Sequence, residues 1–432
     1  MAIISISDSQ VNSADQILVA DSNSKIPAKD GSQITVLNAT NVASGTIASA
    51  RLDTGTTAGK LVVLDGSGNL PAVDASLLTG IVSATISASD PTISTNPSGG
   101  VGTEWNNSTS GEMYICTDAT AGANVWTNVG AGSDNIVPWT FGGTNFGYCS
   151  GAYVASPGSA SRDWIQKFSF TSDADATDSG NLTVPQWGGA GIGSTTHGYT
   201  CGGYYHTVTG YIDVIDKFSF SAGGNAVDVG NLTGAKTYAC TTSDKSTYAY
   251  VHSGSTPDMN VIERFSLTTD GNATDVGDLT GAKRWAAGAS TQSYAYAAGG
   301  FGSIDVIERY QMVASANGVD VGDLFLGGGD GAAGVTSDTH GYYIREHPSN
   351  PSGQDIQKYA LASSANATAI GDLTVYKDAE SGTTSTTHGY IAGGQASPTN
   401  SIEKFSLSSD GNSAVVANLA YGTESGAAGT EY

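Results

Sequence analysis

Residues 262–281 read IERFSLTTDGNATDVGDLTG, and close variants of this stretch recur through the C-terminal two-thirds of the chain. The first half, IERFSL, alternates apolar and polar residues, which is the period of a half-buried β-strand. TDGN is a tight-turn sequence because Gly and Asn tolerate a positive φ. ATDVGDL then predicts a second strand that pairs with the first. The stretch is therefore expected to be a β-hairpin in a fold built from one repeated unit.

Three anchor residues define this unit: an Ile before a basic-aromatic pair, a Leu after Asn or Asp, and a Tyr that closes a polar turn. The anchors are Ile165, Ile215, Ile262, Ile307, Ile356 and Ile402; Leu182, Leu232, Leu279, Leu324, Leu373 and Leu419; and Tyr148, Tyr199, Tyr250, Tyr296, Tyr342 and Tyr390. Each Ile precedes its Leu by 17 positions, whereas the distance from Tyr to the next Ile ranges from 11 to 17. Almost all variation in length therefore falls in one segment of the unit.

The remainder of each unit predicts two more strands. A run rich in Gly, Ala, Ser and Thr precedes a polar turn such as THGY, and an apolar strand follows that turn. Four short strands in roughly 45–50 residues are typical of a propeller blade. The run of small residues suits the innermost strand, because that strand is crowded at the axis. The segment ESGAAGTEY at residues 424–432 resembles this first strand, so we expect it to complete the first blade.

Several of the apolar strands end in Gly-Gly, as at Gly202-Gly203, Gly299-Gly300 and Gly393-Gly394, and a variable loop and an aromatic strand follow. This order resembles the kelch repeat, over roughly residues 136–432. It departs from that family where kelch repeats carry a Trp, since the fourth strand here reads DVGDL. Together with the period, the resemblance predicts an all-β fold whose residues 136–432 form a six-bladed kelch-like β-propeller.

The N-terminal region lacks the repeat. Residues 1–86 are expected to be an attachment and shaft region, and residues 87–135 a small β-rich module with Trp105, Tyr114 and Trp126 as its aromatic core. The segments GNLPAVDASLLTGI and GTEWNNSTSGEMYICTDATAGANVWTNV resemble bacteriophage tail and head fibres, over roughly residues 40–130. The resemblance implies a virion protein made in the host cytoplasm. It also implies a homotrimer whose N-terminus binds other virion proteins.

Composition excludes several partners. The net charge of −23 would repel nucleic acid and anionic membranes. The N-terminus, MAIISISDSQ, lacks the basic start and apolar run of a signal peptide, and no apolar run is long enough to insert in a membrane. Cys116, Cys149, Cys201 and Cys240 show no metal-ligand spacing. We expect them to be small buried residues rather than disulfides.

The variable segments between each Tyr and the next Ile, and the links between units, are expected to lie on one face of the ring. They are rich in Tyr, Ser, Gly, Pro and His, a mixture typical of recognition loops. The predicted receptor-binding residues are Tyr153, Trp164, Trp187, Tyr204, Tyr205, His206, Tyr211, Trp285, Phe301, Arg345, His347 and Tyr376. Their expected partner is a glycan or protein of the host surface. The alternative is that these loops are merely tolerated and that the Trp residues cover the blade cores.

We predict no metal or cofactor. His197, His340 and His388 occupy equivalent turns on different blades, so they are expected not to converge. The Asp and Asn residues of the DGN turns resemble a calcium loop only loosely, because the distal Glu is missing. A glycosidase needs a pair of convergent carboxylates. Most acidic residues here fall in repeat positions and are dispersed, which argues against an enzyme.

The leading hypothesis is therefore a phage fibre that recognises the host through its propeller loops. Two alternatives remain: a structural fibre attached to the capsid without a receptor, and a tail spike that cleaves polysaccharide.

Overall fold

The structure is a computed structural model. It describes residues 84–129, 136, 139–154, 160–206, 210–255, 257–302, 304–312, 316–329, 331–346, 354–374, 377, 381–394, 400–423 and 428–431. By internal contacts the chain divides into Met1–Thr85 and Ile86–Tyr432. The regular structure of these residues is entirely β-strand, which confirms the prediction of an all-β protein. The shaft predicted for residues 1–86 lies almost wholly outside the described residues.

Six four-stranded antiparallel sheets follow the six repeats, as predicted, and within each sheet the strands lie in repeat order. The first sheet contains β28 (Ala428–Glu431), β5 (Phe146–Val154), β6 (Ala160–Ser169) and β7 (Thr177–Gln186). The second contains β8 (Ala190–Gly193), β9 (His197–Tyr205), β10 (Gly210–Ser219) and β11 (Val227–Asn231). The third contains β12 (Cys240–Ser243), β13 (Tyr248–His252), β14 (Met259–Ser266) and β15 (Thr274–Lys283). The fourth contains β16 (Ala287–Ser290), β17 (Tyr294–Ala298), β18 (Val306–Gln311) and β19 (Val319–Asp323). The fifth contains β20 (Ala333–Thr336), β21 (His340–Glu346), β22 (Gln354–Ala360) and β23 (Thr368–Asp372). The sixth contains β24 (Ser381–Thr384), β25 (His388–Ala392), β26 (Ser401–Ser406) and β27 (Ala414–Asn418).

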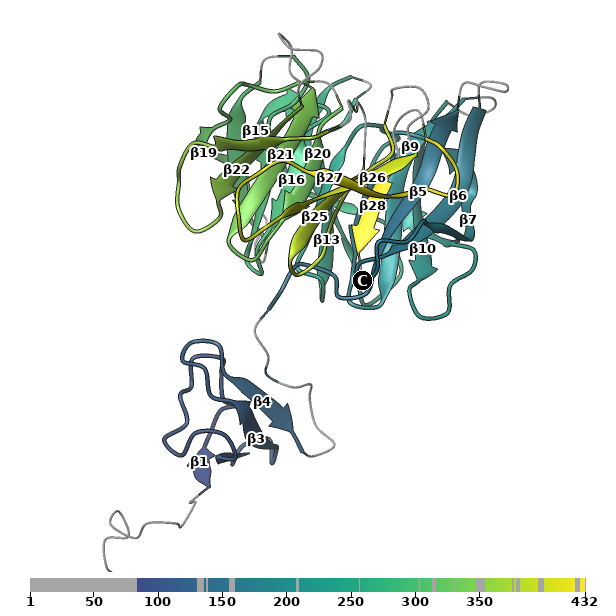
Figure 1. The fold of residues 1–432 in the computed structure, drawn as a ribbon. Helices are drawn as coiled ribbons and strands as arrows, with labels where there is room; N and C mark the ends of the chain where they lie inside the picture. The colour runs from purple at the N-terminus through teal and green to yellow at the C-terminus, as the bar shows by residue number, and fades with distance from the viewer. Residues whose placement is uncertain are drawn as a thin grey trace, which may run out of the picture. The chain divides into compact units, whose positions relative to one another are not determined.

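The first strands of the six sheets contact one another in a closed cycle. The contacts run β8–β12, β12–β16, β16–β20, β20–β24, β24–β28 and β28–β8. Figure 1 shows β28, in yellow, beside β5 of the first repeat. The last strand of the chain therefore completes a sheet whose other three strands come from the first repeat.

Close approach of these first strands explains their small residues. In each of them the second residue is only half-buried, and five of these six positions are Gly. A Cβ on Gly382 would lie 2.1 Å from the carbonyl oxygen of Gly334, and a Cβ on Gly429 would lie 2.2 Å from that of Gly382. The exception is Thr241, whose hydroxyl donates to the carbonyl of Gly191 at 2.6 Å. The backbones can meet in this way only where side chains are absent or very small.

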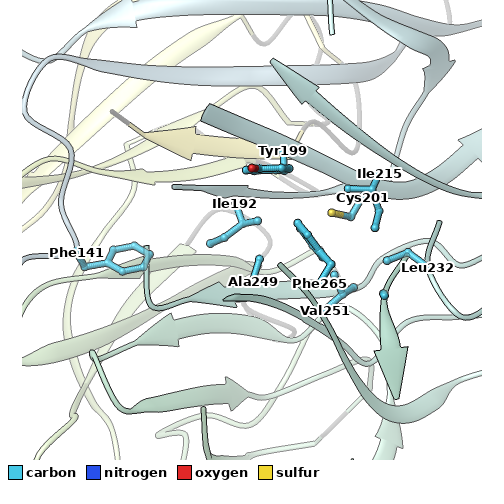
Figure 2. Close-up of a cluster of buried hydrophobic side chains, with 10 residues drawn as sticks. Phe141, Ile192, Tyr199, Cys201, Ile215, Leu232, Ala249, Val251 and Phe265 are labelled. Carbon is cyan, nitrogen blue, oxygen red and sulfur yellow. The ribbon is translucent and has the colours of Figure 1, made fainter. Parts of the chain in front are cut away.

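The aromatic anchors of neighbouring repeats pack between their sheets. Each anchor Tyr of a second strand contacts the aromatic residue of the next repeat's third strand, with ring centroids 5.3–6.1 Å apart. The pairs are Tyr148–Phe218, Tyr199–Phe265, Tyr250–Tyr310, Tyr296–Tyr359, Tyr342–Phe405 and Tyr390–Phe168. The last pair joins the sixth repeat to the first. Figure 2 shows one such core, where Tyr199 and Phe265 lie among Ile192, Ile215 and other apolar side chains.

The DGN turn adds a hydrogen bond between neighbouring sheets. Asn272 Oδ1 accepts from the backbone N–H of Asn231 in the preceding repeat at 3.0 Å. Four other turn Asn residues make the same bond: Asn225, Asn317, Asn366 and Asn412. In the first repeat Asp175 takes this role and accepts from the N–H of Asn418 at 2.8 Å. The constant length of the hairpin therefore keeps this acceptor in register with the preceding sheet.

Buried lysine–glutamate pairs join three neighbouring pairs of sheets in the described part of the chain. Lys236 pairs with Glu263, Lys283 with Glu308 at 2.6 Å, and Lys377 with Glu403 at 4.0 Å. Lys236 and Lys377 lie in links between repeats and Lys283 ends β15, just before such a link, and each Glu follows the anchor Ile of the next repeat. The equivalent third-strand residues of the other repeats are Gln166, Asp216 and Gln357, and the links before them contain no Lys. Lysine therefore occurs in a link only where the partner position is Glu.

The small N-terminal sheet has the order β1 (Thr85–Ser87), β2 (Glu104–Asn107), β3 (Met113–Asp118) and β4 (Val125–Asn128). The predicted aromatic core is present: Tyr114 and Trp126 are fully buried, and Trp105 meets Trp126 edge to face at 5.8 Å. Ile136 forms a β-bridge with Trp126, so this residue belongs to the small sheet. A single aromatic cluster thus stabilises a module with short strands.

All four cysteines are free and buried, which confirms the prediction of no disulfide among them. Burial raises the pKa of Cys149 to about 11 and that of Cys240 to about 12. Thiols of this kind are inert core residues.

Candidate functional site

A left-handed residue precedes the first strand at every link where this position is described. The residue two places before that strand has φ values of 66°, 57°, 56° and 61° at Gly188, Tyr238, Trp285 and Gly331. The Tyr238 N–H donates to the carbonyl of Gly188 at 2.7 Å, and the Trp285 N–H donates to the carbonyl of Tyr238 at 3.0 Å. Backbone hydrogen bonds therefore connect each of these three successive links to the next. Two of these links place a large aromatic residue where a left-handed backbone favours Gly.

A continuous aromatic cluster extends from these links into the variable segments. We call it the aromatic strip, and it consists of Tyr153, Trp187, Tyr204, His206, Tyr211, Tyr238, Trp285 and Phe301. Adjacent ring centroids lie 4.6–6.4 Å apart. Most contacts are tilted or edge to face, the arrangements that aromatic pairs prefer. The strip joins residues of the first four repeats.

Backbone contacts hold the strip in place. Trp187 and Tyr204 form a β-bridge that links the start of the second repeat to the end of β9. The hydroxyl of Ser161, in the neighbouring sheet, donates to the carbonyl of Tyr204 at 3.2 Å and accepts from the N–H of His206 at 2.9 Å. The variable segment after β9 is therefore attached at its base to the preceding sheet.

Arg284 supports the far end of the strip. Its guanidinium lies 3.7 Å from the ring centroid of Phe301 and 5.2 Å from that of Trp285. It also pairs with Asp258 at 2.6 Å. Cation–π contact and ion pairing together fix the orientation of this Arg beside two aromatic rings.

Two cavities meet at Tyr238. One, of about 270 Å³, is lined by Trp187, Tyr204, His206, Tyr211, Thr237 and Tyr238. The other, of about 130 Å³, lies among the first strands and is lined mainly by Gly, Ala, Thr and Ser, with Tyr238 and Trp285 also in its wall. The aromatic strip therefore reaches the cavity among the first strands.

Residues 139–143 approach this inner cavity from the side of the turns between first and second strands. Phe141 lines the cavity, and its N–H donates to Asp338 in the turn before β21 at 3.1 Å. Trp139 donates from its indole to the carbonyl of Asp244, in the turn before β13, at 3.1 Å. Lys245 lies 4.5 Å from the ring centroid of Phe141 and pairs with Glu431 of the last strand. This segment thus ties together turns of different repeats.

The structure brings most of the predicted receptor-binding residues together. Tyr153, Trp187, Tyr204, His206, Tyr211, Trp285 and Phe301 all belong to the aromatic strip. Tyr205 is half-buried and, as the neighbour of Tyr204 in β9, points to the other side of the strand. Trp164 lies elsewhere and stacks on Tyr421 at 4.4 Å. His347 and Tyr376 lie outside the described residues.

The assignment of Arg345 to the binding surface is wrong. Its side chain is fully buried, and its guanidinium donates to the carbonyls of Gly328 at 2.6 Å and Leu326 at 2.9 Å. A buried guanidinium with carbonyl partners stabilises the link before the fifth sheet and is not available to a ligand.

Tyr238 is the residue that the sequence reasoning missed. It occupies the same repeat position as Trp285, two places before the first strand, and this position was the available signal. The contacts of Tyr238 with Trp187 and Trp285, at 5.6 and 4.6 Å, join the two halves of the strip.

The residues considered for metal binding have other contacts. His197, His340 and His388 lie in three different sheets, and each ring Nδ1 contacts a neighbouring Thr hydroxyl at 2.8–2.9 Å. Desolvation, with a smaller effect of nearby Lys residues, lowers the pKa of all three imidazoles. In the turns between third and fourth strands, Asp270 of a DGN sequence pairs with Lys217, and Asp173 of the first repeat's SDAD sequence pairs with Lys404. In the part of the chain that is described, no three His, Cys, Asp or Glu side chains converge on one point.

Within the described ranges no helix has the length and hydropathy needed to cross a bilayer. Comparison with protein-family models and with curated proteins gave no match to this chain.

Proposed function

We propose that residues 139–432 form a six-bladed, kelch-like β-propeller, while Ile136, the first residue predicted for it, pairs with the small N-terminal sheet instead. The closed cycle of contacts among the six first strands supports this architecture, and so does the pairing of β28 with β5. In a propeller the innermost strands surround an axis, which accounts for their Gly and Ala residues. Closing the ring with the last strand removes exposed sheet edges.

This propeller would be the host-recognition part of a bacteriophage fibre, a virion protein that trimerises and attaches to other virion proteins through its N-terminal region. The resemblance of roughly residues 40–130 to phage fibres supports the virion assignment. The observation that carries the binding function is the aromatic strip. Tyr211 and Phe301, at its two ends, are 41% and 39% exposed. Large exposed aromatic groups gathered on variable loops are typical of recognition surfaces.

Weak contacts of one propeller with a host glycan or protein would be multiplied in a trimer, because linked sites bind with a high effective concentration. No cofactor and no catalytic step is needed for this role. The function is therefore reversible attachment to a cell surface.

The test uses the purified full-length chain, labelled with a fluorophore and applied to a panel of bacterial strains. We expect binding to a subset of strains, and loss of that binding in the double variant Tyr211→Ala/Phe301→Ala. The matched control is Val319→Ala, which removes an exposed apolar side chain (53% exposed) from a fourth strand outside the aromatic strip. Binding that is unchanged in the double variant would refute the role of this face. Immunogold labelling of virions would locate the protein on the particle.

A further inference from the structure

We propose that Trp187, Tyr204, His206, Tyr211 and Tyr238 form a binding site for an uncharged sugar ring of a surface glycan. This inference rests on the proposed host-recognition function. It adds the residues that make the contact and the chemical class of the ligand.

The shape of the site suits a pyranose. The five side chains and Thr237 line a cavity of about 270 Å³. The ring planes of Trp187 and Tyr204 are inclined at 70°, and those of Tyr204 and Tyr211 also at 70°. The cavity is therefore bordered by ring faces and ring edges in different directions. A pyranose presents apolar C–H faces that stack on aromatic rings, and its hydroxyl groups can bond to the polar atoms of Tyr, Trp and His.

The charge of the site favours a neutral ligand. Among the described residues, those that line this cavity include no Asp, Glu, Lys or Arg, although the chain contains 40 acidic residues. An anionic sugar would require a cationic partner, and Arg284, at the other end of the strip, is already paired with Asp258. A quaternary ammonium group also binds aromatic rings, but it would gain from a carboxylate that this site does not provide. A neutral sugar needs neither charge.

The backbone supplies an independent sign of function. Tyr238 and Trp285 are left-handed at a repeat position where Gly188 and Gly331 show that Gly is accepted. A left-handed conformation is costly for an aromatic residue, and such outliers cluster at ligand sites. In addition, the indole N–H of Trp187 has no acceptor among the described residues and is covered from solvent. This unpaired donor belongs to a side chain that lines the cavity.

The experiment measures binding of the full-length chain to an array of bacterial surface polysaccharides, followed by calorimetry with the bound saccharide. Sialyllactose and choline serve as anionic and cationic probes. We expect binding to at least one neutral saccharide. We also expect Tyr211→Ala and Tyr238→Gly each to weaken it by about tenfold, the loss of one aromatic contact. Tyr238→Gly installs the residue of two other links, so its thermal midpoint should stay close to that of the wild type. Val319→Ala should bind like the wild type.

The outcomes separate the site from the function. If host cells are bound but no neutral saccharide is, or if only choline or sialyllactose is bound, the ligand class is wrong and the recognition function stands. If a neutral saccharide binds equally well to Tyr211→Ala and Tyr238→Gly, the site is wrong. If Tyr238→Gly lowers the thermal midpoint strongly, the saccharide affinity of Tyr211→Ala alone tests the site, because Tyr211 is exposed. If no bacterial strain is bound, the proposed function itself fails.

Discussion

Replacing Lys236 by Met should destabilise the ring of sheets strongly, because it leaves a carboxylate buried without its cation. The side chains of Lys236 and Glu263 are 1% and 0% exposed. After the change, Glu263 keeps the backbone N–H of Thr233, at 2.6 Å, as a partner but loses the ammonium group. Removing one partner of a buried ion pair costs about 3–5 kcal/mol of unfolding free energy.

The repeats themselves provide the compensating change. In the fifth repeat Gln357 replaces the Glu and accepts from the N–H of Phe325 at 2.7 Å, and the link before it has no Lys. The double variant Lys236→Met/Glu263→Gln takes over this Gln, and it places Met where the fifth repeat has Gly328. It should recover most of the lost stability and end within about 1 kcal/mol of the wild type, because neither position then buries an unpaired charge.

The assay is guanidinium unfolding of the full-length chain, followed by near-ultraviolet circular dichroism. For an unfolding slope of about 5 kcal/mol per molar denaturant, the single variant should lower the midpoint by about 0.6–1 M. The matched control is Lys217→Met. Lys217 pairs with Asp270 at 2.7 Å, but the two side chains are 20% and 55% exposed, so the loss should be below about 1 kcal/mol. The reasoning is refuted if Lys236→Met behaves like this control, or if the double variant is no more stable than the single one.

Three further changes test other parts of the fold. Desolvation, and then the charges of Lys283 and Lys236, lower the pKa of the buried His252 to about 3, so folding favours its neutral form. The free energy of unfolding should therefore be highest above pH 6.5 and should fall by about 1.4 kcal/mol per pH unit as the pH drops toward 3. In His252→Ala, the dependence of this free energy on pH should lack that contribution. Gly382→Ala places a Cβ 2.1 Å from a carbonyl oxygen, so thermal unfolding should show a free energy of unfolding lower by about 3 kcal/mol. In the control Gly281→Ala no atom lies within 4 Å of the added Cβ, so this free energy should hardly change. Deleting Ala428–Glu431 should expose the edge of β5 and cause aggregation on size-exclusion chromatography; a stable, monodisperse product would contradict the role of β28.

The sequence predicted the repeated sheet well because each repeat contains strong local signals. Alternation in IERFSL, the DGN turn and the fixed Ile-to-Leu distance all depend on residues close together in the chain. The small residues of the first strands were also recognised from the sequence, and the close approach of neighbouring first strands explains them. The candidate site was predicted less completely. Loop composition pointed to Trp187, Tyr204 and Trp285, but Arg345 proved to be buried. For a charged residue at the end of an apolar strand, the sequence does not show whether backbone carbonyl groups will surround the side chain.

The pairing of the last strand with the first repeat was predicted and is confirmed, but side-chain contacts between neighbouring repeats were not predicted, because they join residues about one repeat apart. The lysine–glutamate pairs can be seen as a pattern only after the structure places each link beside the next third strand. Tyr238 likewise became a site residue only when its backbone proved left-handed and its ring proved to bridge Trp187 and Trp285. Neither property is a consequence of residue type.

The sequence by itself thus determined the all-β class, the strands of each repeat and their order, since these follow from periodicity and turn chemistry over short distances. Tertiary structure alone decided which side chains from different repeats meet: the aromatic strip and the buried ion pairs. The physical reason is that strand formation depends on local pattern, whereas a site depends on distances between loops that the packing of whole sheets sets.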